Sequence, residues 1–155
     1  MNREILIRQA NEILDAEPWY VSAMSNISAL IMESMEKLNW AGFYMVRENR
    51  LVVGPFQGKP ACIHILFGKG VCGSAVQTDK ILVVPDVHLF QGHIACDSAS
   101  ESEIVVPIHS GGKIAAVMDI DSIEKNRFSE EDAQMFTELV KTIEKKIVWD
   151  PSNDY

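Results

Sequence analysis

The spacing of hydrophobic residues in the first quarter of the chain predicts helices. Between Val21 and Leu38 they recur at steps of three and four residues: Val21, Met24, Ile27, Leu30, Ile31, Met35 and Leu38. That spacing places them along one side of an α-helix, because about 3.6 residues make one turn. We therefore expect one helix over residues 21–38 with a buried stripe, and a shorter helix before it.

Strand-like patterns follow the helical region. Aromatic and β-branched residues fill 40–46 and 51–57, and Arg47-Glu48-Asn49-Arg50 separates the two runs, which predicts a hairpin. Residues 63–66 would form a third, short strand. The break at Gly68-Lys69-Gly70 ends this part of the pattern.

The middle of the chain predicts a short helix over residues 71–78 and a strand over 81–84. The next segment, 85–102, contains few core-like residues for its length. A connection that long inside a small domain usually serves a function, so we expect a functional loop here.

A second hairpin and a final helix are expected in the last third. Residues 104–108 and 114–120 flank Ser110-Gly111-Gly112. Ser129 with Asp132 three positions later predicts a helix start, followed by hydrophobic residues on one face: Ala133, Phe136, Leu139, Val140, Ile143 and Ile147. Because hairpins outnumber crossovers, the order predicts an antiparallel α+β fold, not a parallel doubly wound sheet. We find no linker or repeat and expect one domain over residues 1–155.

Charge and hydropathy narrow the class of protein. The chain has 155 residues, with 14 Lys and Arg against 22 Asp and Glu, which gives a net charge of −8. Nucleic-acid binding needs clustered positive charge, so we expect no nucleic-acid partner. No hydrophobic run approaches the ~18 residues of a membrane span. The first eight residues also lack the hydrophobic core of a secretory signal, so we expect no membrane association and a cytoplasmic location.

Three cysteines, Cys62, Cys72 and Cys96, are too few and too odd in number for a disulfide framework, so they are free thiols, metal ligands or redox groups. A histidine lies close to a cysteine in two segments, Cys62-Ile63-His64 and His93-Ile94-Ala95-Cys96. Neither segment contains the paired C-x-x-C of structural zinc sites, and a domain of this size does not need a metal. We therefore expect no metal, although His93 is a candidate for holding Cys96 as a thiolate.

A glycine-rich segment imitates a dinucleotide-binding motif. Gly68-Lys69-Gly70-Val71-Cys72-Gly73 fits G-x-G-x-x-G, and Asp86 closes a later strand, as a ribose-binding acid would. The helix between them is too short, and a hairpin follows instead of another strand–helix–strand unit. We therefore expect turn glycines and no cofactor. Cys72 would lie in the first helical turn, where the helix dipole favours a thiolate.

Three acidic residues of the second hairpin are candidate catalytic groups. The two-residue period of a strand puts Asp119 and Asp121 on one face. With a three-residue loop, Glu103 pairs with Asp119 and lies diagonal to Asp121, whereas a two-residue turn at Gly111-Gly112 sends Glu103 to the other face. Glycine content does not choose between these turns. Crowded carboxyl groups raise at least one pKa and keep an acid protonated, whereas a solvated strand end would have no function.

Two hydrophobic surfaces allow both a structural and a functional interpretation. Trp40 and Tyr44 share one face of the first strand by alternation, so they either line a pocket or pack the sheet. The hydrophobic stripe of the final helix fits a domain core or the seam of a homodimer. Core packing is the commoner outcome for such residues.

Several segments together resemble the free methionine-(R)-sulfoxide reductases. The resemblance runs in uninterrupted order from Trp40 to the final helix. It rests on Trp40-Ala41-Gly42-Phe43-Tyr44, Gly54-Pro55-Phe56-Gln57-Gly58-Lys59-Pro60-Ala61-Cys62, Gly70-Val71-Cys72-Gly73, His93-Ile94-Ala95-Cys96-Asp97, Ser102-Glu103-Ile104-Val105-Val106-Pro107 and Asp119-Ile120-Asp121-Ser122. The later segment Arg127-Phe128-Ser129-Glu130-Glu131-Asp132 resembles the end of GAF domains in general.

This resemblance implies a fold, a reaction and partners. The family is built on a single GAF domain, which implies a six-stranded antiparallel sheet with helices packed on one face. Its members reduce the R epimer of free methionine sulfoxide, not the residue inside proteins, and need no cofactor. A thioredoxin-type dithiol restores the oxidised enzyme.

The matching cysteines receive their roles from the resemblance. Cys96 is expected to attack the sulfoxide sulfur and become a sulfenic acid, which Cys62 converts to a disulfide. Cys72 would be an accessory thiol. The disulfide requires Cα atoms within about 7 Å of each other in at least one conformation.

The resemblance also assigns roles to acids and aromatic residues. Glu103 and Asp121 are candidates for donating a proton to the sulfoxide oxygen, and Asp119 for binding the substrate ammonium. Trp40 and Tyr44 would line the pocket for the methyl group. Because Glu103 must join the two aspartates, we expect the three-residue loop in the second hairpin, with Glu103 across from Asp119.

Two other functions remain open from the sequence. A GAF domain can sense a ligand without catalysis, although sensors are usually fused to an output domain. The same cysteines can also form a redox-sensing switch, in which a disulfide forms without turnover of sulfoxide.

Overall fold

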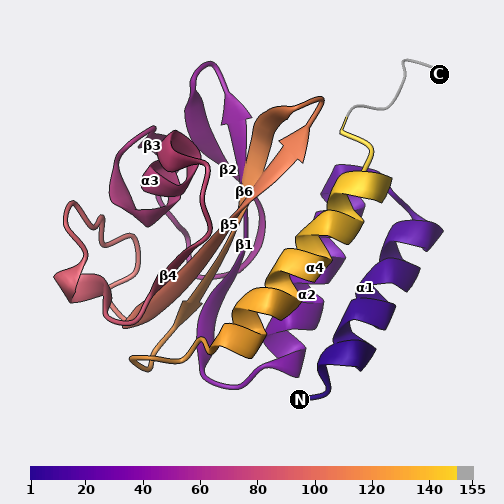
Figure 1. Cartoon of the computed structure of the whole chain (residues 1–155), viewed down its shortest axis with the longest axis horizontal. Coiled ribbons are helices and arrows are strands. Elements are labelled where there is room, and N and C mark those ends of the chain that lie inside the picture. The colour runs from indigo at the N-terminus through magenta and orange to yellow at the C-terminus, as the bar shows by residue number, and fades with distance from the viewer. Residues whose placement is uncertain (150–155) are drawn as a thin grey trace.

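The computed structural model describes residues 1–149 and contains a six-stranded antiparallel sheet in the order β3-β2-β1-β6-β5-β4 (Figure 1). Its strands are β1 (Leu38–Arg47), β2 (Arg50–Gly58), β3 (His64–Leu66), β4 (Leu82–Val84), β5 (Ser102–Ser110) and β6 (Lys113–Ser122). The helices are α1 (Arg3–Ala16), α2 (Tyr20–Ser34), α3 (Gly70–Thr78), the 3-10 helix η1 (Val87–Leu89) and α4 (Glu130–Lys146). The predicted antiparallel α+β class is confirmed.

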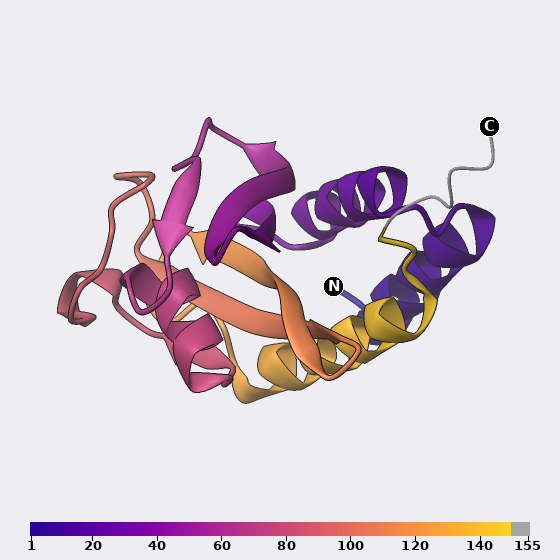
Figure 2. The same cartoon turned by 90° about the horizontal axis from the view of Figure 1, so that it is seen from above.

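Helices lie on both faces of this sheet, in unequal numbers. On one face, α2 packs against β1 and β2, α4 packs against β5, and α1 covers both helices from outside (Figures 1 and 2). The short helix α3 lies on the other face, against β5 and β6. The expected packing of helices on one face of the sheet therefore holds for three of the four α-helices, α1, α2 and α4. Among residues 1–149, no helix combines the length and hydropathy that a bilayer crossing requires.

The expected helix over residues 21–38 is shorter in the structure. α2 ends at Ser34, and Met35 is already extended, with φ −120°. Lys37 then adopts a left-handed conformation, with φ 67°, which turns the chain into β1. Leu38 continues the helical spacing by coincidence and belongs to the strand. The helix expected before it is α1, which at 14 residues is nearly as long as the 15-residue α2.

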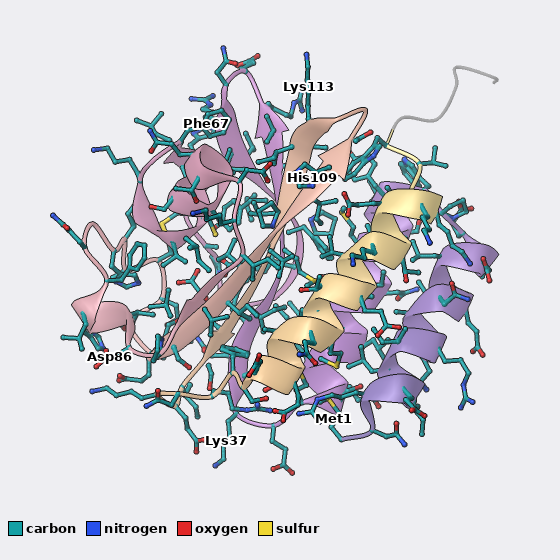
Figure 3. The ribbon with its side chains drawn as sticks, in the orientation of Figure 1. Met1, Lys37, Phe67, Asp86, His109 and Lys113 are labelled. Carbon is teal, nitrogen blue, oxygen red and sulfur yellow. A yellow bond between two sulfur atoms is a disulfide. The ribbon has the colours of Figure 1, made fainter. Side chains whose placement is uncertain are left out.

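Two-residue turns join the strands of both long hairpins. Glu48 and Asn49 connect β1 to β2 with φ values of 53° and 61°. Gly111 and Gly112 connect β5 to β6 with φ values of 59° and 78°, close to Lys113 in Figure 3. Positive φ at both positions matches the twist of the strands, which is why such turns favour tight hairpins.

The predicted three-residue loop of the second hairpin is therefore wrong. A two-residue turn alone would send Glu103 to the face covered by α2 and α4. However, Ala115 has no partner on β5, and this β-bulge shifts the register by one further residue. Glu103 consequently pairs with Asp121 instead of Asp119, and it still shares a face with both aspartates.

The residues of α3 explain the glycine-rich segment in structural terms. A Cβ atom on Gly73 would lie 2.3 Å from the carbonyl oxygen of Leu66, so the helix can pack this closely only with glycine. Asp86 accepts a hydrogen bond from the amide of His88 at 3.0 Å and begins η1. Gly68 and Gly70 adopt φ values of 81° and 61° where β3 leads into α3, which supports the interpretation as turn glycines.

The hydrophobic stripe of α4 packs in the core of the domain. Ser129 and Asp132 form the predicted capping box, in which each side chain binds the other's backbone amide. Phe136, Leu139 and Ile143 are fully buried against the sheet and the other helices. This stripe therefore does not form the seam of a homodimer.

Candidate active site

A small cavity lies on the face of the sheet that carries α3. Its volume is about 40 Å³, and its lining comes from β1, β3, α3, β5, β6, the connection between β2 and β3 and the connection between η1 and β5. The lining residues are Trp40, Tyr44, Lys59, Pro60, Ala61, Ile65, Gly70, Val71, Cys72, His93, Ile94, Cys96, Asp97, Ser100, Glu103, Asp119 and Asp121. Seven of the eight candidate residues line it, and the eighth, Cys62, is bonded to Cys96.

Cys62 and Cys96 form a disulfide, with their Cα atoms 5.4 Å apart. Cys62 lies in the connection between β2 and β3, and Cys96 lies in the long connection between η1 and β5. Both are half-buried. The expected approach within about 7 Å is confirmed, and neither sulfur is free to bind a metal in this state.

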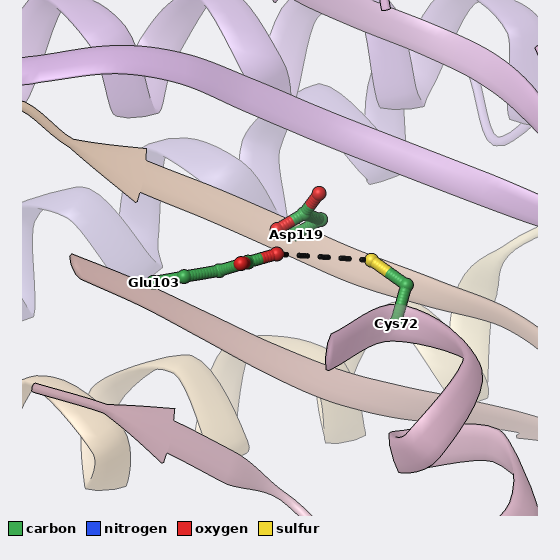
Figure 4. Close-up of side chains that lie close together, drawn as sticks. All are labelled: Cys72, Glu103 and Asp119. Atoms are coloured by element: carbon green, nitrogen blue, oxygen red, sulfur yellow. Dashed lines mark hydrogen bonds between the residues drawn. The ribbon is translucent and has the colours of Figure 1, made fainter. Parts of the chain in front are cut away.

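The three acids converge at one end of β5 and β6. Glu103 and Asp119 are buried, and Glu103 lies directly across from Asp121. The Sγ of Cys72 donates to Oε1 of Glu103 at 3.9 Å, and Asp119 lies beside them (Figure 4). The interpretation as a solvated strand end therefore does not hold.

The three carboxyl groups differ in how strongly their surroundings favour the protonated form. Burial raises the pKa of all three. It raises the pKa of Glu103 and that of Asp121 well above the usual range, and the charge of Asp119 raises both further. Burial also raises the pKa of Asp119, but hydrogen bonds from Glu103, Cys72 and Asp121 counteract this effect. The arrangement therefore favours two protonated acids that donate to one carboxylate, Asp119.

Cys72 does not have the thiolate character expected from its place in a helix. Burial and the neighbouring Asp119, Glu103 and Asp121 raise its pKa well above that of a free thiol. A helix N-terminus contributes only about 0.3–1 kcal/mol toward an anion, which is less than the effect of burial beside three acids. The thiol is therefore protonated at neutral pH, and the expectation of a thiolate is wrong.

Trp40 and Tyr44 form a stacked wall of the cavity, with ring centroids 5.7 Å apart. Nε1 of Trp40 donates to the carbonyl of Lys59 at 3.2 Å, and the hydroxyl of Tyr44 donates to the carbonyl of Cys62 at 3.0 Å. Burial and the charge of Asp119 raise the pKa of Tyr44, so its phenol keeps the donated proton. The pair thus also holds the segment that carries Cys62, a role that the sequence did not indicate.

Asn39 is a further residue that the sequence analysis missed. Its Nδ2 donates to Oδ2 of Asp97 at 3.0 Å and to Oγ of Ser100 at 2.9 Å. The side chain of Ser100 in turn counteracts the raised pKa of Asp121. Asn39 has no partner on β6, so it forms a bulge next to Trp40. It thereby connects β1 to the segment that directly follows Cys96.

His93 lines the cavity but does not favour a thiolate at Cys96. Burial and the positive charge of His88 lower the pKa of His93, so its imidazole is neutral at pH 7. Only an imidazolium would stabilise a neighbouring thiolate by charge.

Two groups of side chains have the spacing of metal ligands within residues 1–149. One is Cys72, Glu103 and Asp119, and the other is Asp86, His88 and Glu101. In each group the ligand atoms lie within 4.8 Å of one another. Members of the second group already have partners: Oε2 of Glu101 contacts Nε2 of His88 at 3.2 Å, and Asp86 forms an ion pair with Lys125 at 3.1 Å. Neither group uses the Cys–His pairs considered from the sequence.

Comparison with known proteins identifies the family. Residues 4–147 match the GAF domain. The free methionine-R-sulfoxide reductase of Escherichia coli (strain K12) is 46% identical over 140 residues, which cover 90% of this chain and 85% of that protein. This chain belongs to the free methionine-R-sulfoxide reductases, a family of GAF domain proteins.

Solved structures agree with this membership of the reductase family. The fRMsr of Staphylococcus aureus in complex with substrate is 46% identical, with a TM-score of 0.90, and the match covers 95% of this chain and 96% of that one. The free methionine-R-sulfoxide reductase of Neisseria meningitidis in complex with its substrate is 40% identical, also with a TM-score of 0.90, over 93% and 87% of the two chains. The resemblance and the GAF fold are thus confirmed.

Proposed function

We propose that this chain reduces free L-methionine (R)-S-oxide to L-methionine, with Cys96 as the nucleophile and Cys62 as the resolving thiol. The observation that carries the proposal is the disulfide between them, which adjoins a cavity lined by three acids. Kinship with reductases of that name supports the same chemistry. Two thiols supply the two electrons that the reduction of a sulfoxide requires.

The reaction begins with the thiolate of Cys96 attacking the sulfoxide sulfur. The oxygen takes up a proton and passes to the Cys96 sulfur, so that methionine leaves and a sulfenic acid remains. The thiolate of Cys62 then attacks this sulfur and displaces the oxygen as water. The disulfide in the structure corresponds to the product of this step.

Glu103 and Asp121 donate the proton to the oxygen, because a sulfoxide oxygen is a poor leaving group until it is protonated. Their raised pKa values keep both acids protonated near neutral pH. Asp119 is the acid that most favours ionisation, and it binds the substrate ammonium. Trp40 and Tyr44 form the wall against which the methyl group packs.

A thioredoxin-type protein reduces the disulfide and completes the cycle. The half-buried disulfide is flanked by exposed apolar side chains, of which Ile63 is 62% exposed and Ile94 is 39% exposed. Such a surface suits a protein reductant better than a small charged thiol.

Epimer-resolved turnover tests this function. The purified protein, thioredoxin, thioredoxin reductase and NADPH are mixed with either the R or the S epimer of free methionine sulfoxide. We expect NADPH oxidation with the R epimer alone, and none with methionine sulfoxide inside a peptide. A redox switch would consume NADPH only once, to open its disulfide, and a ligand sensor would show no turnover, so either result would contradict the proposal.

A further inference from the structure

Cys72 is a buried thiol that the proposed reaction does not use. It is only 4% exposed, and its sulfur stays free while the other two cysteines are bonded to each other. Its Sγ lies 3.9 Å from Oε1 of Glu103, and Asp119 lies beside both (Figure 4). One ligand atom from each of these three residues lies within 4.8 Å of the other two. A thiol and two carboxyl groups that converge in this way can all bind the same metal ion.

The distance between the sulfur and the carboxyl oxygen is close to that of a tetrahedral zinc site. Zinc–sulfur bonds of about 2.3 Å and zinc–oxygen bonds of about 2.1 Å, at the tetrahedral angle, separate sulfur from oxygen by about 3.6 Å. The 3.9 Å between Cys72 and Glu103 is only slightly longer, and a small rotation of either side chain removes the difference. Three protein ligands leave a fourth position for a water molecule.

The charge of the cavity is a second, independent observation that favours a cation. Asp119 is only 5% exposed, and its Oδ1 accepts no hydrogen bond within residues 1–149. The ion pairs in this part of the chain include none with Glu103, Asp119 or Asp121. Lys59 lines the cavity, but it is exposed. A buried carboxylate favours a positive partner, because it has lost the water that would otherwise solvate it.

The thiol decides which metal ions suit these ligands. Mg²⁺ and Ca²⁺ bind oxygen ligands, whereas Zn²⁺ binds thiolate and carboxylate groups in one four-coordinate site. Metal ions bind the ionised forms of these groups, so the thiol and the carboxylic acid release their protons when the ion binds. The disulfide leaves Cys72 available for this purpose.

We propose that Cys72, Glu103 and Asp119 form a binding site for Zn²⁺, and that the bound ion inhibits the enzyme by excluding the substrate. The ion is an inhibitor and not a cofactor. It displaces the proton that Glu103 gives to the sulfoxide oxygen, and it takes the place of the substrate ammonium at Asp119. The inhibition rests on the proposed function, whereas the binding of the ion does not.

The disulfide-bonded protein gives a direct test of binding, because Cys72 is then the free thiol. Co²⁺ alone is added as a coloured substitute for Zn²⁺, and a thiolate bound to Co²⁺ gives a charge-transfer absorption in the near ultraviolet. We expect this absorption to saturate at an equimolar ratio and to disappear when Zn²⁺ is added, since Zn²⁺ prefers a tetrahedral site with a thiolate. Binding of Co²⁺ without the thiolate absorption would overturn the site, because surface oxygen and nitrogen atoms would then hold the ion.

Variants identify the ligands one by one. Cys72→Ser should abolish the absorption. Glu103→Gln and Asp119→Asn each remove a carboxylate and should weaken Co²⁺ binding by about 10- to 100-fold, a loss that even an outer partner of a metal ligand causes. The matched control is His88→Ala, which alters the second group with metal-ligand spacing and should leave the absorption and the affinity unchanged. Loss of the absorption in His88→Ala would overturn the site, as would unchanged affinity in both carboxylate variants, which also decide the matter if Cys72→Ser fails to fold.

Inhibition is measured in a single turnover by pre-reduced protein from which the reductant has been removed, with and without equimolar Zn²⁺. Zn²⁺ should slow the release of methionine at low substrate concentration but not at high concentration, because the ion and the substrate compete for Asp119. Relative to its own rate without metal, Cys72→Ser should need at least about tenfold more Zn²⁺ for the same inhibition. Equal inhibition of this variant would place the ion on reduced Cys62 and Cys96 and overturn the inhibitory role. A failure to release methionine even without Zn²⁺ would overturn the proposed function and the inhibition with it, whereas the cobalt spectra decide the binding site in either case.

Discussion

The two faces of the sheet use the same strands for opposite purposes. Along β6, Met118 and Ile120 point into the core under α2 and α4, whereas Asp119 and Asp121 point into the cavity beside α3. The face that α2 and α4 cover, called the helix-covered face below, contains a large hydrophobic cluster. The opposite face has a smaller cluster, interrupted by three acids, a thiol and a disulfide.

This difference shows where stability and chemistry reside. Each large side chain buried on the helix-covered face stabilises the fold by about 2–5 kcal/mol relative to alanine. Acids buried together destabilise it, by about 1.4 kcal/mol for each unit by which a pKa is raised. The hydrophobic face thus compensates for a cavity whose acids are held in unfavourable surroundings.

The largest expected effect is on the cavity face, at the nucleophile. Cys96→Ser should abolish even a single turnover, because a hydroxyl does not replace the thiolate in the attack on sulfur. Cys62→Ser should release one methionine per chain and then stall at the sulfenic acid. Mixing excess substrate with pre-reduced protein and quantifying methionine measures both. A complete first turnover by the Cys96 variant would reverse the assignment.

The next largest effects concern the protonated acids. Glu103→Gln and Asp121→Asn keep the shape and remove the transferable proton, so kcat should fall by about 10²–10⁴-fold. Asp119→Asn should act mainly on KM, because Asp119 binds the ammonium. Steady-state kinetics with the R epimer distinguish these outcomes. Small, equal effects at all three positions would mean that none of the acids takes part in the reaction.

A substitution on the helix-covered face should have the reverse signature. Leu139 is fully buried, so Leu139→Ala should lower the free energy of unfolding by about 2–5 kcal/mol. Its kcat should stay near that of the wild type under conditions where the variant is folded. Urea unfolding and steady-state kinetics on one preparation test this. A kcat reduced as strongly as that of Glu103→Gln would remove the distinction between the two faces.

Alternation along the strands was enough to predict which residues share a face. It placed Asp119 with Asp121, and Trp40 with Tyr44, because the two-residue period of a strand depends on little else. The start of α4 was equally predictable, since the capping box at Ser129 is a local interaction.

The sequence-based predictions that proved wrong depend on single-residue irregularities in the strands and on neighbours distant in the sequence. The bulges at Ala115 and Asn39 change the register of the strand pairs and the face to which the following side chains point. Neither alanine nor asparagine signals a bulge in the sequence. The protonation of Cys72 depends on acids that lie 31 and more residues away in the chain, and helix position alone pointed the other way. The roles of the site residues came from family resemblance, because spacing alone left zinc, redox and structural interpretations open.

The smallest expected effect is a difference in how stability depends on pH. Well below pH 4 the carboxyl groups of Glu103 and Asp121 are protonated in both the folded and the unfolded chain. As the pH rises further, the unfolded chain ionises while folded Glu103 and Asp121, with raised pKa values, keep their protons. The free energy of unfolding therefore falls by about 1.4 kcal/mol per pH unit for each such group, until the pH reaches its folded pKa.

Glu103→Gln removes one of these groups, so its stability should decline less steeply than that of the wild type between pH 5 and pH 7.5. Urea unfolding of the disulfide-bonded protein measures this, because Cys62 and Cys96 then do not titrate. Asp86→Asn is the control: Lys125 lowers the pKa of Asp86, which is ionised in both states over this range and contributes no slope. Parallel curves for Glu103→Gln and wild type would mean that Glu103 is ionised in the folded protein. The cavity face would then hold its acids as carboxylates, without a proton to give to the substrate.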